Sequence, residues 1–179
     1  IIAGLGLFGV AVALGAQDLF KNLISGVLVL IEKRFKKGDV IIIEGVIEGV
    51  VEKIGFRSTA IRKFDKSLCY IPNNQFAENA VTNISETSNR RINWLIGLEY
   101  KTTTKQLKMI CRDIEELISN NKEDFSVTPK TPVIVKINEF AASSIDILVR
   151  CFANTSDYEE FVNTKDKLAI GIKEIVERR

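Results

Sequence analysis

An uncharged, apolar run at the start of the chain constrains its fold more than any other feature. Residues 1–16 contain no charged and no hydrogen-bonding side chain, whereas the chain after Glu32 is an ordinary mixture of charged and apolar residues. As an α-helix the run would span roughly 24 Å at about 1.5 Å per residue, less than a bilayer core of about 30 Å. Because the sequence begins without methionine, we expect this helix to continue upstream of Ile1.

The composition excludes most kinds of catalytic and metal-binding site. The 179 residues include no histidine, which removes Ser-His-Asp and Cys-His nucleophile systems and histidine-ligated zinc. Cys69, Cys111 and Cys151 lie far apart without a C-x-x-C pair, which predicts no metal site and thiols that are packed in a reducing compartment. The glutamate pairs at 115–116 and 159–160 fit solvated helix faces. We therefore predict a protein that is not an enzyme and binds no cofactor.

The small residues of the apolar run separate into two flanks on a helical wheel of about 100° per residue. The first flank consists of Gly6, Gly9, Ala13 and Ala16. The second flank consists of Gly4, Ala11 and Gly15, and the narrow face between the flanks consists of Ala3, Leu7, Val10 and Leu14. Two small flanks allow identical helices to pack closely on both sides and close into a ring, so the narrow face would line a pore. The alternative is an ordinary buried helix.

The same residues also match a dinucleotide-binding fingerprint. Gly4, Gly6 and Gly9 fit G-x-G-x-x-G, and a strand at 27–31 followed by Glu32 would supply the ribose-binding acid of an oxidoreductase. However, the residues after Gly9 show no polar face, and the body continues as consecutive strands instead of alternating strands and helices. A Rossmann-like fragment is therefore kept as the weaker alternative.

A second helix of a different kind is expected over residues 19–31. Its apolar positions form one stripe, which consists of Leu19, Phe20, Leu23, Ile24, Val27, Leu28 and Ile31. Gln17 and Asp18 would interrupt the helical run and cap the second helix, which would lie along a membrane interface or cover a soluble domain. The basic cluster that follows consists of Lys33, Arg34, Lys36 and Lys37. It favours the cytoplasmic side and anionic head groups, unless it is simply a solvated run of charges.

The soluble body divides into two patterns of secondary structure. Period-two alternation predicts short strands at 40–43, 46–54, 56–64, 68–71 and 80–84, with a helical turn at 73–79, which together suggest a small barrel. Residues 85–89 are polar and form the expected linker. The remainder predicts strands at 91–100, 133–140 and 144–152 and helices at 103–120 and 158–176. This βαββα order is typical of an α+β fold with helices on one face of an antiparallel sheet.

Nearly the whole chain resembles the small-conductance mechanosensitive channel (MscS) family. The resemblance rests on the order and spacing of several short motifs. Those motifs are the Gly/Ala-rich helix, Gln17, Asn22-Leu23, Ser25-Gly26-Val27-Leu28, Phe35, Gly38-Asp39, Gly45, Gly49, Tyr70-Ile71-Pro72-Asn73, Asn89-Arg90-Arg91, Ile96-Gly97-Leu98-Glu99-Tyr100 and Ser143-Ser144.

The resemblance implies a homoheptameric, multi-pass channel of the bacterial inner membrane that opens under tension and passes ions and small osmolytes. By position, the apolar gate falls on Val10 and Leu14, the kink on Gln17 and Asp18, and the membrane-proximal basic residues on Lys33 and Lys36. The implied architecture is a pore helix over 1–17, an amphipathic interfacial helix over 18–32, an Sm-like β-barrel over 33–87 and a ferredoxin-like α/β domain over 88–179, the last two in the cytoplasm.

Some features of the sequence differ from this family pattern. Well-known members have glycine where Asp18 stands, so kinking on inactivation is expected to differ. The family's upstream membrane helices and its short C-terminal strand do not occur in this sequence.

An RNA-binding Sm-like module is the other alternative to a channel. The net charge of only +2 and the two-residue basic patch Arg90-Arg91 argue against it, because single-stranded RNA needs stacking aromatic rings in a basic groove. We therefore predict contacts with other copies of the chain and with membrane lipids, and no nucleic-acid partner.

Overall fold

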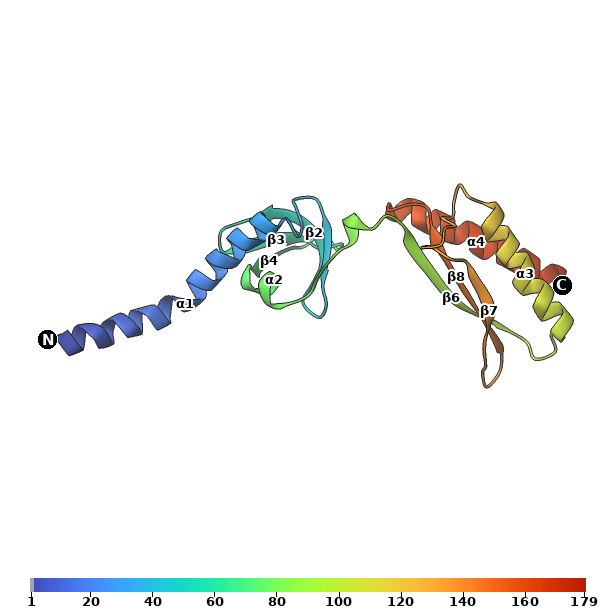
Figure 1. Cartoon of the computed structure of the whole chain (residues 1–179), viewed down its shortest axis with the longest axis horizontal. Helices are drawn as coiled ribbons and strands as arrows, with labels where there is room; N and C mark the ends of the chain where they lie inside the picture. Colours follow the sequence, from blue (N-terminus) through green and yellow to red (C-terminus); the bar gives the residue numbers. More distant parts are fainter. Residues whose placement is uncertain (1) are drawn as a thin grey trace. The chain divides into compact units, whose positions relative to one another are not determined.

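The computed structural model describes residues 2–179, although the side chains of residues 2–5 and 7 lie outside that description. The chain divides into two compact units between Glu86 and Thr87, inside the predicted linker. The N-terminal unit contains one long helix and a five-stranded sheet. The C-terminal unit contains a three-stranded sheet and two helices (Figure 1).

The N-terminal helix differs from the prediction. One α-helix, α1, runs without interruption over Ile2–Glu32, so the break predicted at Gln17 and Asp18 is wrong. Its ribbon changes direction along its length in Figure 1, but the helix continues through this point. Asp18 does not cap a new helix. Its carbonyl oxygen instead accepts a 2.9 Å hydrogen bond from Nδ2 of Asn22 one turn later. Side-chain bonds of this kind bend helices without ending them.

The continuous helix also excludes the dinucleotide-binding alternative. The backbone at Gly4, Gly6 and Gly9 is helical and therefore forms no phosphate-binding loop between a strand and a helix. Residues 27–31, which that alternative needs as a second strand, belong to the same helix. A Rossmann fingerprint requires a strand before the glycines and a tight turn through them.

The β-domain, residues 38–86, follows the predicted strand order. Its elements are β1 (Val40–Ile43), β2 (Ile47–Ile54), β3 (Ser58–Arg62), β4 (Leu68–Pro72), α2 (Asn74–Glu78), β5 (Val81–Asn83) and the 3-10 turn η1 (Ile84–Glu86). The strands form one antiparallel sheet in the order β4-β3-β2-β1-β5. Two glycines with positive φ, Gly38 at 95° and Gly45 at 73°, allow the turns at the two ends of β1.

The core of the N-terminal unit joins the sheet to the end of α1. It consists of Val29, Phe35, Ile41, Ile43, Ile47, Val51, Ile61, Ile71 and Phe76. Alternate residues of β1 face this core, as the period of two requires. The rings of Phe35 and Phe76 lie 5.0 Å apart between centroids, which fixes the segment after α1 against α2.

The C-terminal unit has the predicted βαββα order. Its elements are β6 (Arg90–Leu98), α3 (Thr104–Asn120), β7 (Ile134–Phe140), β8 (Ile145–Ala153) and α4 (Tyr158–Arg178). The antiparallel sheet has the order β6-β8-β7, and both helices cover one of its faces (Figure 1). A capping box between Thr103 and Gln106 begins α3, and the side chain of Asp157 caps α4. The buried residues of α3, Leu107, Ile110, Ile114 and Ile118, form one apolar stripe at helical spacing.

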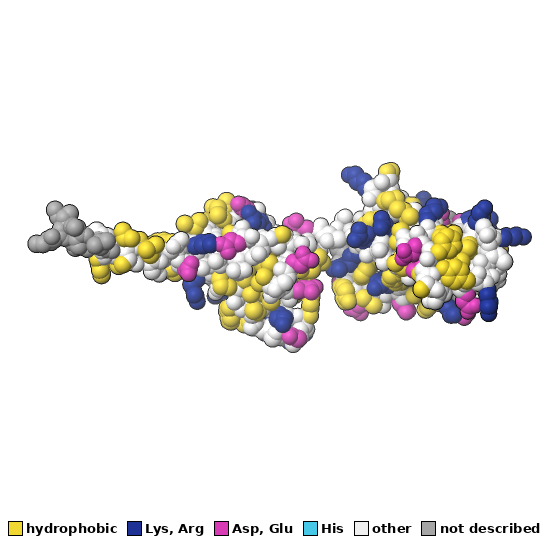
Figure 2. Space-filling model, turned by 90° about the horizontal axis from the view of Figure 1, so that it is seen from below, with side chains coloured by type: hydrophobic (Ala, Val, Ile, Leu, Met, Phe, Trp, Pro, Cys, Tyr) yellow, Lys and Arg dark blue, Asp and Glu magenta, His cyan; other side chains and the backbone are white. Residues whose placement is uncertain are grey.

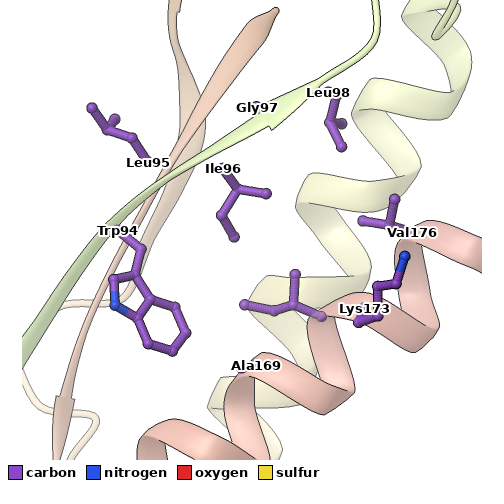
Figure 3. Close-up of a pocket in the computed structure, with 9 residues that line it drawn as sticks. Trp94, Leu95, Ile96, Gly97, Leu98, Ala169, Lys173 and Val176 are labelled. Atoms are coloured by element: carbon purple, nitrogen blue, oxygen red, sulfur yellow. The ribbon is translucent and has the colours of Figure 1, made fainter.

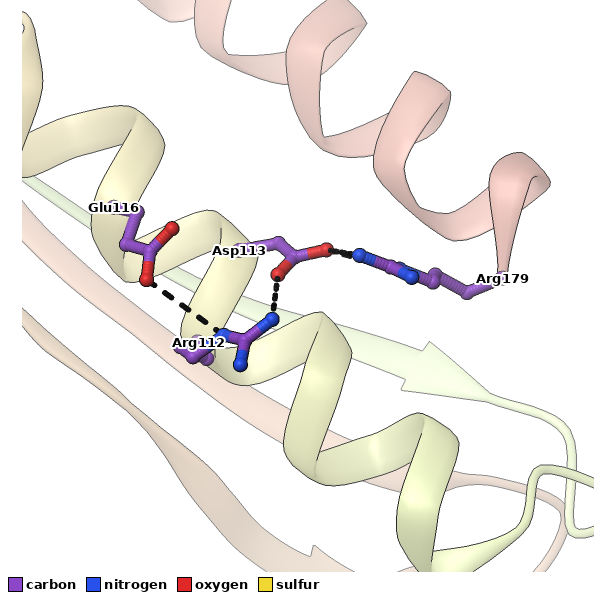
Figure 4. A network of polar contacts seen from close by, with 4 residues as sticks. All are labelled: Arg112, Asp113, Glu116 and Arg179. Atoms are coloured by element: carbon purple, nitrogen blue, oxygen red, sulfur yellow. Dashed lines mark hydrogen bonds and ion pairs between the residues drawn. The ribbon is translucent and has the colours of Figure 1, made fainter.

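A polar network fixes the C-terminal end of α4 on α3 (Figure 4). Nε of Arg179 donates a 2.9 Å hydrogen bond to Oδ2 of Asp113, and Nη2 of Arg112 donates a 3.2 Å bond to the other carboxylate oxygen. The bond from Arg179, followed by the smaller effect of Arg112, holds the pKa of Asp113 below its usual value. This stabilisation is present above the ordinary carboxyl pKa and is lost as the pH falls through the lowered pKa.

Replacing Asp113 with asparagine is expected to loosen the end of α4. The D113N variant loses the charge that pairs with Arg179, so backbone amides over residues 172–179 should exchange hydrogen several-fold faster at neutral pH. The matched control is Glu116→Gln, because the contact of Glu116 with Arg112 is an exposed pair at 3.6 Å and pairs of this kind contribute little. Equal exchange in wild type and D113N would show that the pair does not anchor the helix.

Candidate functional site

The first half of α1 exposes apolar side chains around its whole circumference. Val10 and Leu14 are 58% and 67% exposed, and Val12, which lies on the opposite side of the helix, is 54% exposed. Figure 2 shows apolar side chains on the face of this part of the helix that is turned to the viewer. The stretch from Phe8 to Glu32 is long and apolar enough to cross a membrane by length and composition. A helix that is apolar on all sides requires lipid or other helices around it.

The described glycines on this half have no packing role among the residues that the structure describes. A methyl group added at Gly6, Gly9 or Gly15 would meet no atom within 4 Å. Ala11 and Ala13 are also exposed. The described members of the two flanks are therefore exposed, apart from Ala16, which is half-buried. The predicted contributions of Ala3, Gly4 and Leu7 concern side chains that lie outside the described residues.

The second half of α1 packs on the β-domain with its polar face, not with its apolar stripe. Asn22, Ser25 and Val29 are buried there, while Phe20 and Ile24 of the stripe are each 60% exposed. Oδ1 of Asn22 accepts a 2.9 Å hydrogen bond from the backbone N–H of Asn74, and Lys21 forms an ion pair with Glu78 of α2. The exposed stripe therefore faces away from the β-domain, as an interfacial helix requires.

Gly26 allows the closest approach between α1 and the β-domain. A Cβ atom at this position would lie 2.5 Å from Nδ2 of Asn73 and 2.8 Å from the carbonyl oxygen of Phe56. Both distances are well below van der Waals contact, so only glycine fits without movement of the helix. Gly26 thus has an intrachain role that the glycines of the first half do not have.

Replacing Gly26 with valine is expected to destabilise this contact. Overpacking of this kind costs about 1–3 kcal/mol, so G26V should unfold at a lower temperature in detergent, as measured by scanning fluorimetry. Its neighbour Val27, which is half exposed at 50%, supplies the control Val27→Leu, for which no clash is expected. If both variants unfold at the wild-type temperature, then α1 does not depend on this close approach.

Asn73 organises the turn between β2 and β3, which sequence reasoning missed. Its Nδ2 donates 2.9 Å hydrogen bonds to the carbonyl oxygens of Gly55 and Phe56, and its backbone N–H donates a 2.9 Å bond to that of Arg57. Its Oδ1 accepts a 2.9 Å bond from the buried hydroxyl of Thr59. The motif that contains Asn73 was noted, but only the fold shows that the side chain and the backbone N–H of this one residue bind three consecutive carbonyl oxygens, those of Gly55, Phe56 and Arg57.

The predicted basic cluster follows the end of α1. Lys33, with a φ of 50°, ends the helix. The side chains of Lys33, Lys36 and Lys37 are exposed, as is that of Arg34. Arg34 pairs with Glu32 and donates a 3.3 Å hydrogen bond to the carbonyl oxygen of Phe76, so part of its charge is used within the unit.

A groove in the C-terminal unit lies between the edge strand β6 and α4 (Figure 3). It encloses about 450 Å³ and is lined by Trp94, Ile96 and Leu98 from the strand and by Ala169 and Val176 from the helix. Among the described residues that line the groove, Lys173 is the one with a charged side chain. An apolar groove without paired acids and bases offers a packing surface, not a catalytic arrangement.

Comparison with known proteins identifies the family. Residues 18–86 match the model of the mechanosensitive ion channel β-domain, and residues 92–179 match that of the MscS C-terminal domain. The chain belongs to the MscS family. Its relatives include an uncharacterised MscS family protein of Aquifex aeolicus, 40% identical over 99% of this chain and 47% of the relative. Another is the small-conductance mechanosensitive channel MscMJ of Methanocaldococcus jannaschii, 35% identical over 99% of this chain and 49% of the relative.

A solved structure of the family has the same fold. The crystal structure of Helicobacter pylori MscS in a closed state is similar with a TM-score of 0.84 and 30% identity, over 100% of this chain and 67% of that one. The resemblance to the MscS family is thereby confirmed. The chain spans about half the length of the curated relatives named above. Members of this family are membrane channels and not enzymes, which agrees with the prediction.

Proposed function

We propose that the full-length protein is a mechanosensitive ion channel that opens under membrane tension and releases ions and small osmolytes. In this proposal seven copies assemble in the bacterial inner membrane, with the body of each copy in the cytoplasm. Two curated or solved relatives carry the name of mechanosensitive channel or MscS. The single observation that carries the proposal is that the first half of α1 is apolar on all sides and that its described glycines, Gly6, Gly9 and Gly15, contact no other described part of the chain.

The proposed gate consists of rings of Val10 and Leu14. Both are exposed and lie within about 40° of each other on the helix, so symmetric copies would turn them toward the axis together. A narrow apolar ring excludes water and stops ions without filling the pore. Ala3 and Leu7 would extend the same lining toward the N-terminus.

Opening follows from the difference in membrane area between two states. Tension acts on membrane area, so it shifts the equilibrium between the closed and open states only as far as their membrane areas differ. The flanks formed by Gly6, Gly9, Ala13 and Gly15 would let neighbouring helices slide and tilt past one another.

The proposal assigns a separate role to each segment of the chain. In the proposal, residues 1–17 line the pore, residues 18–32 lie at the membrane interface, residues 33–87 form an Sm-like domain and residues 88–179 form a ferredoxin-like domain. The β4-β3-β2-β1-β5 order and the βαββα order support the last two assignments. Lys33, Lys36 and Lys37 would contact anionic head groups.

Patch-clamp recording of the full-length protein under suction tests the proposed function. We expect single-channel currents above a reproducible suction threshold in membranes from cells that lack their own mechanosensitive channels. Membranes without the protein are the control. Expression and assembly of the protein with no current up to the lytic tension would contradict the proposal.

A further inference from the structure

The turn between β2 and β3 presents a large apolar side chain to the outside of the β-domain. Phe56 is 85% exposed, the highest exposed fraction among the described large apolar residues. Full exposure of a phenylalanine to water is unfavourable because burial of such a side chain contributes about 1.5–3 kcal/mol. The neighbouring Arg57 is also exposed, so the tip of this turn pairs an aromatic ring with a positive charge.

Hydrogen bonds fix the backbone of this turn, although the side chain of Phe56 at its tip is exposed. The carbonyl oxygens of Gly55, Phe56 and Arg57 all accept hydrogen bonds from Asn73, which is fully buried. The N–H of Gly55 donates a 3.1 Å bond to the carbonyl oxygen of Ser58 and closes the turn. A rigid turn presents its aromatic side chain at a small entropic cost when a partner covers it.

The turn lies beside the part of α1 that belongs to the candidate membrane span. The carbonyl oxygen of Phe56 approaches Gly26 closely, and Gly26 belongs to the candidate membrane span from Phe8 to Glu32. Gly26 lies six residues before the end of α1, about 9 Å along the helix axis. The exposed side chains of Val27 and Ile31 extend the apolar surface beyond Gly26 toward the basic cluster.

We propose that Phe56 and Arg57 form a lipid-contact site of the β-domain, in which the ring enters the membrane interface beside α1 and the guanidinium binds an anionic head group. The inference rests on the proposed function, because it requires α1 to enter a membrane. Lipid is the occupant that fits the position of Gly26 within the candidate membrane span and the positive charge of the exposed Arg57 at the tip of the turn. Aromatic and basic side chains are enriched at this level of membrane proteins.

Brominated lipids test this contact because they quench nearby tryptophan fluorescence. The full-length protein, with its native tryptophans replaced by phenylalanine, receives Phe56→Trp and is reconstituted in phosphatidylcholine–phosphatidylglycerol vesicles with or without brominated chains. We expect at least a twofold loss of emission in the brominated vesicles. The matched control is Phe64→Trp at the β3–β4 turn, since Phe64 is 59% exposed and should keep its emission.

A third variant separates this inference from the proposed function. Phe20→Trp places the probe on the exposed stripe of α1, where quenching reports insertion of the helix. Quenching at 20 without quenching at 56 overturns the lipid site and leaves the channel proposal intact. No quenching at either position overturns both. Disulfide-linked dimers of a Phe56→Cys variant, together with unquenched Trp at 56, would assign the ring to a neighbouring copy and also overturn the lipid site.

Discussion

Replacement of Leu14 with serine is expected to lower the tension at which the channel opens. Burying a leucine in a dry ring contributes about 1.5–3 kcal/mol per side chain, and the substitution removes that term from every copy. A hydroxyl group also holds water in the constriction, so the closed state loses its apolar barrier. Suction thresholds in patch recordings should fall clearly below that of wild type, and cells that express the variant should grow poorly.

The control for this experiment is Val12→Ser. Val12 lies about 160° from Leu14 around the helix and is similarly exposed, at 54% against 67%. A serine there changes the polarity of α1 to the same degree but not that of the proposed axis face. An unchanged threshold for L14S, or an equal fall for both variants, would count against Leu14 as a gate residue.

Replacement of Ala13 with valine is expected to have the opposite effect. The added methyl groups lie on a small flank that has no neighbour within the chain, so they act only on contacts between copies. Overpacking of a close interface costs about 1–3 kcal/mol per site, and β-branched side chains resist the sliding that opening requires. The suction threshold of A13V should rise, or the channel should fail to open before the patch breaks.

The control for A13V is Val12→Ile, which adds bulk one position away on the outer face of the helix. Its threshold should stay near that of wild type, because that face would contact lipid. If A13V opens normally and runs at the same size as wild type on a sizing column, the small flank is not a sliding surface between copies.

Most of the fold could be predicted because each unit has a regular apolar period. The alternation at Ile41 and Ile43 placed β1, and the stripe that includes Ile110 and Ile114 placed α3. The prediction of a break at Gln17 and Asp18 was wrong for a local reason. The helix continues through both residues, and Asn22, which binds the carbonyl oxygen of Asp18, also contacts the β-domain through Asn74, which the sequence does not reveal.

The sequence predicted only those features of the candidate site that depend on the geometry of α1 alone. The wheel placed Val10 and Leu14 on one face because helix geometry alone decides this, and their role as a gate stays a prediction. The close approach at Gly26 and the hydrogen bonds of Asn73 join segments far apart in sequence. Their partners follow from the tertiary fold, and no periodic pattern marks them.

The uninterrupted course of α1 joins its exposed first half, the proposed pore segment, directly to the β-domain on which its second half packs. Because backbone hydrogen bonds continue through residue 18, no swivel joint lets one end turn while the other stays in place. A rotation of the segment near Leu14 is therefore expected to displace Asn22 and Gly26, and through them the start of α2 and the turn at Phe56 with which they are in contact. By reciprocity, in the proposed channel a ligand that binds the β-domain beside Gly26 and shifts this helix is expected to change the tension that opens the pore.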